Sequence, residues 1–317
     1  MRLFRPEVFQ GSVKKKNYFE GWYLKHVSAD QKQVYSFIPG ISTAKNDKHA
    51  FIQIINGITG ETHYVVYPIE SFEYKANKFW VRVGDSTFSE SGIDINIQDQ
   101  NIEVTGALKY GELSQYPGSL ISPGIMGWYS YVPFMECYHG IVSANHTLTG
   151  DLLINKSKLD FQNGRGYIEK DWGTSFPECW IWLQSNSFPN SETSLFISVA
   201  KIPWLGNYFM GFIAFLFHEG EYHIFATYNG SKLDHVKRQD NTLTFCLSNS
   251  KEVLKARVEI NSAGELIAPT RGEMNRRIKE SLDSNVEVSL AKNGETIFEG
   301  RSVRAGLEVI EKIFDYL

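Results

Sequence analysis

The chain has 317 residues and a formal net charge of −4. This length exceeds that of a small domain and predicts two domains or one large β architecture, with enough chain to bury a sizeable core. The charge, together with a single short basic run at Lys14–Lys16, leaves no basic surface for a phosphate backbone, so we expect no nucleic-acid partner.

The N-terminus, the longest apolar stretch and the cysteines indicate the compartment. No continuous apolar segment with a small-residue cleavage site precedes Lys16, so no secretory signal is expected. The longest apolar stretch, Phe209–Phe217, is shorter than the roughly 20 residues that span a bilayer and predicts a buried strand. Cys137, Cys179 and Cys246 are widely spaced and predict neither a disulfide framework nor a zinc cluster. We therefore expect a cytoplasmic protein.

The first part of the chain consists of short β-branched or aromatic segments bounded by Gly, Pro, Asn or Asp, which predicts a series of strands. The expected strands are Gly21–Ser28, Val34–Ile38, Ala50–Ile55, Thr62–Tyr67, Phe79–Val83, Ile93–Ile97 and Ile102–Leu108. Turn signals such as Asn56-Gly57 favour a barrel or a sandwich over alternating strand and helix units. An aromatic content of 14% suits such an all-β core and also suits an apolar pocket.

A long segment rich in Pro, Gly and apolar residues then interrupts this pattern between Gln115 and Phe134. Regular structure is difficult to sustain there, and an apolar loop of this length is more typical of a lid or a binding loop than of a simple connection. The alternative is a loop whose apolar side chains pack under the domain. Two further strands, Glu136–Ser143 and Leu148–Ile154, complete the first half.

The stretch from Gly164 to Asn186 holds the candidate functional residues. With the two-residue period of a strand, Tyr167, Glu169 and Asp171 share one face, while Lys170 and Trp172 share the other. After a break at Gly173–Pro177, a second strand places several large or hydrogen-bonding side chains on one side: Trp180, Trp182, Gln184, Asn186 and Phe188. Hydrogen-bonding side chains among large apolar ones predict a pocket for a mostly apolar ligand. The same pattern would also fit the core of a β-sandwich in which the amide side chains point to solvent.

The second half again consists of short strand-like segments separated by turn residues, which predicts a second domain. The predicted domains are residues 1–160 and residues 161–317. The expected strands are Leu195–Ala200, Phe209–Phe217, His223–Tyr228, Leu243–Leu247, Ala256–Ile260, Val286–Leu290 and Thr296–Phe298. A charged stretch of good helix formers predicts a helix over Gly272–Ser281, and Ala305–Leu317 is either strand or helix. A weak internal echo between Tyr18–Trp22 and Tyr167–Trp172 suggests two related halves, each opened by one copy.

Several segments together resemble the tocopherol cyclase family over nearly the whole chain. They are Tyr18–Lys25 (YFEGWYLK), Val132–Gly140 (VPFMECYHG), His146–Gly150, Gly164–Pro177 (GRGYIEKDWGTSFP) and Trp180–Asn186 (WIWLQSN), with weaker likeness at Phe225–Gly230 and Glu299–Gly306. The resemblance implies an all-β fold of two lipocalin-like domains, of β-barrel or sandwich type, with few short helices. It also implies cyclisation of a prenylated hydroquinone or a similar isoprenoid lipid to a chromanol, without a cofactor.

This chemistry protonates an alkene and lets a phenol oxygen capture the resulting cation. It asks for a carboxylic acid kept protonated by its surroundings and for aromatic faces around the cation. We rank Asp171 first as the acid because its neighbour Trp172 should desolvate it, Glu169 second and Glu20 third. The expected substrate-binding residues are Trp22, Tyr167, Trp172, Trp180, Trp182, Gln184, Asn186 and His139. The alternatives are structural carboxylates paired with Arg165 or Lys170, a carrier that binds a lipophile unchanged, and an isoprenoid hydratase.

Other site types find little support in the pattern. His139, His146 and Glu136 have spacings that match no compact metal-ligand set, and no Gly-x-Ser-x-Gly elbow is present, so we expect neither a metal nor a serine nucleophile. A lipid substrate would reside in a bilayer, and apolar loop residues are suited to reversible docking there. We expect peripheral membrane contact through Leu120–Phe134 and through a second group formed by Trp204, Leu205, Tyr208 and Phe209.

Overall fold

The structure is a computed structural model that describes residues 2–45, 47–189, 192–261 and 263–317. Its chain divides into two compact units, the first of residues 1–176 and 265–277, the second of residues 177–264 and 278–317. The expected boundary at residue 160 lies one strand too early, because β12 (Gly164–Gly173) pairs with β1 (Phe19–Val27) and β10 (Cys137–Ile154) of the first unit.

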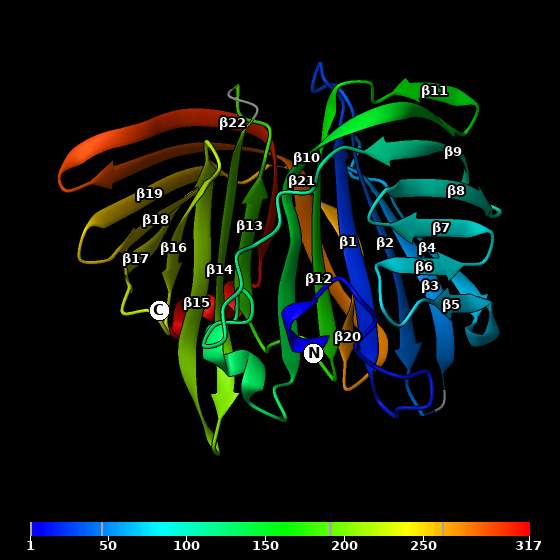
Figure 1. The fold of residues 1–317 in the computed structure, drawn as a ribbon, viewed down its shortest axis with the longest axis horizontal. Helices are drawn as coiled ribbons and strands as arrows, with labels where there is room; N and C mark the ends of the chain where they lie inside the picture. Colours follow the sequence, from blue (N-terminus) through cyan, green and yellow to red (C-terminus); the bar gives the residue numbers. More distant parts are fainter. Residues whose placement is uncertain (1, 46, 190–191, 262) are drawn as a thin grey trace. The chain divides into compact units, whose positions relative to one another are not determined.

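The first unit is built on a 12-stranded sheet whose order is β4-β3-β2-β1-β12-β10-β9-β8-β7-β6-β5, with β11 paired to β10 (Figure 1). The remaining strands are β2 (Val34–Thr43), β3 (Lys48–Asn56), β4 (Thr62–Pro68), β5 (Phe72–Tyr74), β6 (Trp80–Val83), β7 (Ser86–Ser89), β8 (Gly92–Gln98), β9 (Glu103–Tyr110) and β11 (Ser157–Asp160). Three short 3₁₀ helices accompany them: η1 (Arg2–Phe4), η2 (Ile69–Ser71) and η3 (Gly127–Tyr131). The two expected strands at 136–143 and 148–154 form one long strand, β10.

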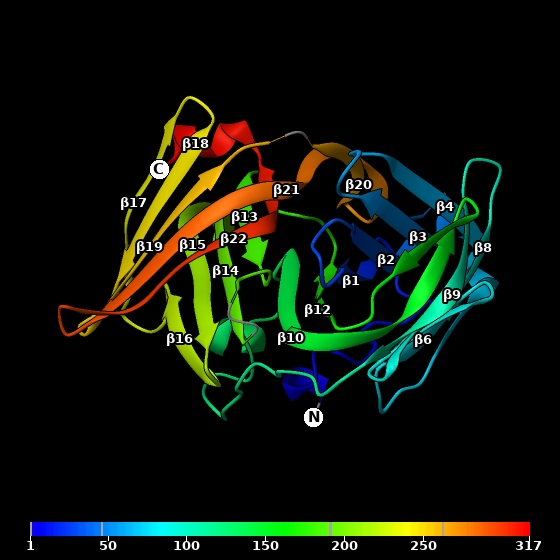
Figure 2. The same ribbon diagram turned by 90° about the horizontal axis from the view of Figure 1, so that it is seen from above.

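The two ends of this sheet curl toward each other, so that β2–β4 and β6–β9 lie on opposite sides of the unit (Figure 2). Trp22 of β1, at the middle of the sheet, stacks on Phe79 near its end with ring centroids 6.1 Å apart. The backbone N–H of Gly84, in the turn after β6, donates a hydrogen bond to Ser71 at 3.1 Å, and a Cβ at Gly84 would lie 2.6 Å from the Tyr67 ring of β4. Gly84 also has φ +56, a backbone conformation that favours glycine. Glycine therefore suits this position because of its conformation and because a larger side chain would meet Tyr67.

The second unit contains most of a 10-stranded sheet with the order β16-β15-β14-β13-β22-β21-β19-β18-β17, and β20 pairs with β21. The strands of this sheet are β13 (Trp180–Ser185), β14 (Thr193–Trp204), β15 (Asn207–His218), β16 (Glu221–Ala226), β17 (Lys232–Gln239), β18 (Thr242–Ser248), β19 (Glu252–Glu259), β20 (Gly264–Thr270), β21 (Glu273–Lys292) and β22 (Glu295–Val309), followed by η4 (Glu311–Asp315). Residues 265–277, which include most of β20 and the start of β21, belong to the first unit. In the second unit, Ile181, Leu183 and Leu195 belong to the buried apolar core. The all-β fold class with few short helices is confirmed.

The helix predicted at Gly272–Ser281 is wrong, because that segment begins the strand β21. The charged side chains that suggested a helix alternate with more buried ones, and Glu280 and Ser281 pair across to Glu308 and Leu307 of β22. Sheet pairing therefore overrides the local helix propensity. The described residues form no helix with the length and apolar character needed to cross a bilayer.

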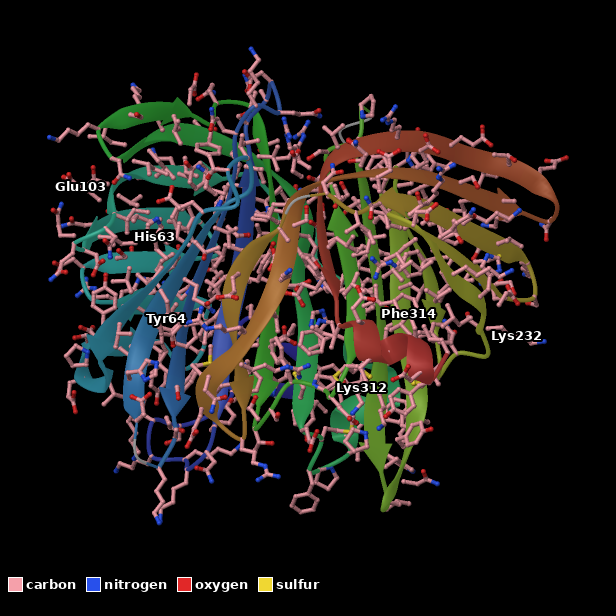
Figure 3. All side chains as sticks on the ribbon, turned by 180° about the vertical axis from the view of Figure 1, so that it is seen from behind. His63, Tyr64, Glu103, Lys232, Lys312 and Phe314 are labelled. Atoms are coloured by element: carbon pink, nitrogen blue, oxygen red, sulfur yellow. The ribbon has the colours of Figure 1, made fainter. Side chains whose placement is uncertain are left out.

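The strand β17 was not predicted because it is highly charged. It lies at one end of the sheet order, and Lys232 on it is exposed (Figure 3). Charged residues are typical of edge strands, where they discourage pairing with another chain.

The similar segments Tyr18–Trp22 and Tyr167–Trp172 do not begin two separate domains. They lie side by side in the first unit, where β1 pairs with β12 so that Glu20 is opposite Trp172 and Trp22 is opposite Lys170. The similarity therefore reflects two neighbouring strands of one sheet.

Candidate functional site

The strand β12 carries functional side chains on both of its faces, as its alternation predicts. Lys170 lies beside Trp22 of β1, whereas Glu169 lies beside Tyr23 and Ile141, and Asp171 lies opposite His139 of β10. The two faces form separate polar groups.

On one face, His139, Glu169 and Asp171 form what we call the acid–histidine cluster. The imidazole Nδ1 of His139 lies 2.9 Å from Asp171 Oδ1, and its Nε2 lies 3.8 Å from Glu169 Oε2. The hydroxyl of Tyr167 donates to Glu169 Oε2 at 2.5 Å, and the thiol of Cys137 donates to Asp171 Oδ1 at 3.6 Å. One imidazole is thus held between two carboxylates, each of which accepts a further hydrogen bond.

The electrostatics of the cluster favour a proton on His139. Burial by itself lowers the pKa of His139, but the charges of Asp171 and Glu169 outweigh it and raise that pKa to about 9. Burial, reinforced by Glu169, raises the pKa of Tyr167 well above its usual value. Burial and Asp171 do the same for the pKa of the Cys137 thiol. The tyrosine and the thiol therefore act as hydrogen-bond donors, and the imidazole holds the exchangeable proton at neutral pH.

The relative burial of the two acids differs from the expectation that placed Asp171 first. Asp171 exposes 23% of its side chain near the end of β12, whereas Glu169, in the middle of the strand, exposes 5%. The stronger desolvation therefore acts on Glu169. The sequence did not predict that His139 would lie between these acids, since this depends on the pairing of β10 with β12.

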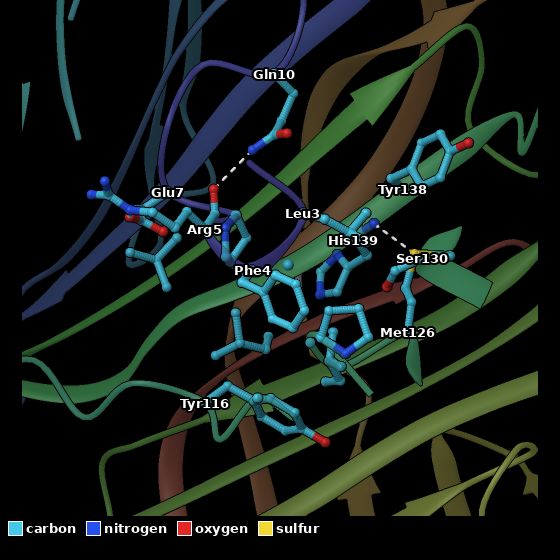
Figure 4. A pocket seen from close by; sticks show the side chains of 18 of the residues that line it. Leu3, Phe4, Arg5, Glu7, Gln10, Tyr116, Met126, Ser130, Tyr138 and His139 are labelled. Carbon is cyan, nitrogen blue, oxygen red and sulfur yellow. Dashed lines mark hydrogen bonds and ion pairs between the residues drawn. The ribbon is translucent and has the colours of Figure 1, made fainter. Parts of the chain in front are cut away.

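A pocket of about 580 Å³ in the first unit includes His139 in its wall. Three segments line it: the N-terminal residues 3–7 with Gln10, the loop that follows β9 through Pro133, and the start of β10 with Trp172 of β12. Figure 4 shows His139 next to Met126, whose sulfur accepts a hydrogen bond from the His139 backbone N–H at 3.1 Å. The apolar loop therefore contributes to a pocket, as a binding loop would.

Glu20 belongs to a second polar group on the other face of β12. Its carboxylate accepts hydrogen bonds from the Tyr18 hydroxyl at 2.5 Å and from the backbone N–H groups of Gln10 at 2.7 Å and Gly11 at 2.9 Å. It also forms a fully buried ion pair with Lys170. Four donors converge on this carboxylate, an arrangement that suits a structural acid anchoring the N-terminal segment to the sheet.

The two tryptophans near Lys170 have different surroundings. The ammonium of Lys170 lies 4.4 Å from the Trp22 ring centroid and 5.1 Å from that of Trp172. Trp22 is fully buried in the apolar core of the first unit, and its indole N–H donates to the carbonyl of Glu7 at 2.9 Å. Trp172 instead lines the pocket and stacks on Tyr138 with ring centroids 5.8 Å apart. Of the two, only Trp172 lines this pocket.

The candidate residues of the second unit lie on and just after β13. Trp180, Trp182 and Gln184 occupy the face opposite the core residues Ile181 and Leu183 and are nevertheless buried. Asn186, just beyond the strand, is buried as well.

Two buried carboxylates that the sequence reasoning missed accompany these tryptophans. The indole N–H of Trp180 donates to Glu308 Oε2 at 2.5 Å, and Glu308 pairs across the sheet with both Trp182 and Glu280. Both acids lie in segments without a motif, one of them in the region predicted as a helix. In the sequence, the two-residue alternation along Glu295–Val309 could have indicated that Glu308 shares a strand face with other buried residues.

The histidines considered for a metal are separated. His146 lies beside Tyr110, with ring centroids 4.4 Å apart, and its Nδ1 is 3.0 Å from the Ser143 hydroxyl. Within the described part of the chain, the group able to hold a metal is the acid–histidine cluster, whose ligand atoms lie within 4.8 Å of one another. One imidazole and two carboxylates are suitable ligands for a divalent cation. A metal would have to displace the proton that the high pKa of His139 retains.

Solved structures of similar fold cover most of this chain. The structure of CghA with Sch210972 has a TM-score of 0.60 at 13% identity and covers 92% of this chain and 88% of that chain. Kievitone hydratase from Nectria haematococca has a TM-score of 0.50 at 12% identity. This match covers 96% of this chain and 94% of the hydratase chain. At these identities the likeness concerns the fold alone.

Curated relatives and a family model add evidence from the sequence. The chloroplastic tocopherol cyclase of Zea mays is 29% identical over 109 residues, which are 33% of this chain and 23% of the maize protein. The probable chloroplastic tocopherol cyclase of Oryza sativa subsp. japonica is 28% identical over 109 residues, with the same shares. The chain thus matches about a quarter of the length of these relatives. The tocopherol cyclase-like family model matches residues 101–310, more than half of the chain, and the chain therefore belongs to this family.

Proposed function

We propose that the protein is a cofactor-independent enzyme that cyclises a prenylated hydroquinone, or a similar isoprenoid lipid, to a chromanol-type ring. The observation that carries this proposal is the imidazole of His139, which lies between Asp171 and Glu169 and belongs to the wall of a pocket lined by polar and apolar groups. Family membership supports the reaction class. The prenylated hydroquinone is proposed from the likeness of the chain to this family.

The proposed reaction begins with proton transfer from the His139–Asp171 pair to the alkene of the substrate. The alkene π electrons form the new C–H bond, which leaves a tertiary carbocation, and the cluster becomes more negative by one charge. Asp171 and Glu169 then face the cation with net negative charge, which stabilises it electrostatically. The phenol oxygen attacks the cation to form the C–O bond and returns its proton to the cluster. No redox change occurs, and the cluster regains its starting protonation state.

The other groups of the site have supporting roles in this proposal. Tyr167 holds the carboxylate of Glu169 in place through its 2.5 Å hydrogen bond. Trp172 and Tyr138 line the pocket from the other face of β12 and β10 and are assigned a role in shaping its wall. Glu20, saturated by four donors, is assigned a structural role. The second-unit residues Trp180, Trp182, Gln184 and Asn186 stay candidate substrate contacts.

Two other functions begin from the same pocket. In a hydratase, protonation of the alkene is followed by capture of the cation by water. In a carrier, the lipophile is bound and released unchanged. The likeness to kievitone hydratase makes hydration the natural second candidate, and at 12% identity that likeness concerns the fold alone.

Mass spectrometry of purified protein incubated with prenylated hydroquinones separates these functions. A cyclase yields a product of the same mass and a shifted retention time, a hydratase adds the mass of water, and a carrier returns the substrate. The first outcome supports the proposal, and the other two overturn it. The incubation is repeated with EDTA, and undiminished turnover is expected because a proton occupies His139. Loss of turnover that added metal restores would replace the proton mechanism by a metal one.

A further inference from the structure

An uncharged surface loop borders the pocket. From Gln115 to Met135 the chain carries no Lys, Arg, Asp or Glu, although these residues make up 21% of the whole. We call this segment the docking loop. Its large apolar side chains are exposed to an unusual degree: Leu120 and Ile121 are each 82% exposed, and Phe134 is 96% exposed. Such a concentration of exposed apolar side chains marks an interaction site.

The tip of the docking loop is a tight turn that holds two of these side chains outward. Ser119 and Ser122 exchange both backbone hydrogen bonds, at 2.7 and 3.1 Å, with Leu120 and Ile121 between them. The hydroxyl of Tyr131 donates to the carbonyl of Leu120 at 2.5 Å. Polar backbone groups at the tip thus have partners within the loop, which lowers the cost of moving the tip out of water.

The distribution of side-chain types along the loop matches a lipid surface. Leu120 and Ile121 are aliphatic and stand at the tip, whereas Trp128 and Tyr131 are about half exposed. Aliphatic side chains favour the acyl region of a bilayer, and Trp and Tyr favour the level of the head groups. A protein-binding site usually surrounds its apolar centre with a polar rim. This loop has no charged side chain for such a rim, and the most exposed side chains at its tip are aliphatic.

The inner side of the same loop lines the pocket. Ile125, Met126 and Val132 belong to the pocket wall, and the Met126 sulfur accepts the backbone N–H of His139. One segment therefore connects exposed apolar side chains to the pocket wall that includes His139. A lipid leaving a bilayer at the loop would meet the apolar side chains of Ile125, Met126 and Val132 at the pocket wall.

We propose that the docking loop rests in the surface of a lipid bilayer and transfers a lipid substrate from the membrane into the pocket. Membrane docking stands on the loop alone, and the transfer step rests on the proposed function. Docking is reversible, because a few side chains enter the interface and no segment spans it.

The test measures co-sedimentation of the full chain with neutral phosphatidylcholine vesicles. The double variant Leu120→Ser/Ile121→Ser is compared with Val66→Ser, which removes an apolar side chain that is 57% exposed on β4. We expect the wild type and Val66→Ser to bind, and the double variant to lose about tenfold in affinity for each side chain removed. Circular dichroism checks that the variants keep the wild-type fold. Equal vesicle binding by wild type and double variant, or no binding by wild type, overturns the proposal.

A second measurement separates failure of docking from failure of the proposed function. Turnover is compared for a long-chain prenylated hydroquinone in vesicles and for a water-soluble short-chain analogue. The double variant should raise KM for the vesicle substrate and leave the soluble one unchanged. Vesicle binding without turnover of either substrate refutes the proposed function but keeps docking. Equal effects of the double variant on both substrates overturn the transfer step.

Discussion

Replacing Asp171 by Asn removes the carboxylate that lies 2.9 Å from His139 Nδ1 while keeping the shape of the side chain. The carboxylates of the cluster raise the pKa of His139 from 6.5 to about 9. At about 1.4 kcal/mol for each pKa unit, this difference favours the protonated imidazole by about 3 kcal/mol. Without Asp171, burial opposes the charge of Glu169 alone. We therefore expect the pKa of His139 to fall and the imidazole to be largely neutral at pH 7.

The pH dependence of turnover measures this change directly. Because the protonated cluster is the active form, wild-type turnover should be constant near neutral pH and decline as the pH rises through about 9. In Asp171→Asn the decline should move to lower pH, and turnover at pH 7 should fall by about 10²- to 10⁴-fold, as for loss of a general acid. An NMR titration of His139 in both proteins assigns the change to that residue.

A matched control is available in the same unit. Asp47 also bonds a histidine, with its Oδ1 3.0 Å from His49 Nδ1, but lies outside the acid–histidine cluster. Asp47→Asn should leave both the rate and the pH profile unchanged. The reasoning is refuted if Asp171→Asn turns over at the native rate with its basic decline still near pH 9. If Glu169→Gln alone abolishes turnover, Glu169 and not Asp171 is the carboxylate that keeps His139 protonated.

Three further predictions concern stability and the second unit. Glu20→Gln leaves Lys170 as a buried cation without its carboxylate, so we expect urea unfolding to show a free energy of unfolding lower by about 3–5 kcal/mol. The turnover of the folded fraction should change little. An unchanged free energy of unfolding would mean that this ion pair contributes nothing to stability. Gly306→Ala places a methyl group 2.6 Å from the Trp182 ring, so we expect it to lower the free energy of unfolding by about 1–3 kcal/mol. Wild-type stability in urea unfolding would contradict this packing. The raised pKa of His139 stabilises the folded state below about pH 6.5, and this contribution of about 3 kcal/mol should disappear as the pH rises through about 9. Thermal unfolding of wild type and His139→Gln between pH 6 and 10 checks it, since the variant should lack this pH dependence.

The sequence by itself determined the features that depend on local periodicity. Alternation along Gly164–Gly173 placed Glu169 and Asp171 on one face and Lys170 on the other, because side chains in any strand alternate with a period of two. Turn residues and β-branched segments likewise predicted most strands and the all-β class. The Pro- and Gly-rich composition of the loop after residue 115 predicted an irregular segment with a binding role, and it does line a pocket.

Only the tertiary structure decided which of these side chains meet. His139 lies more than thirty residues before Asp171 in the sequence and reaches it because β10 pairs with β12. The same pairing made Glu169 the more buried acid, and the folding back of the N-terminal segment turned Glu20 into a structural carboxylate. Glu280 was assigned to a helix because local propensity contains no information about its partner strand. Periodicity is a property of a few neighbouring residues, whereas strand pairing depends on contacts between distant segments, and these place the imidazole between its two carboxylates.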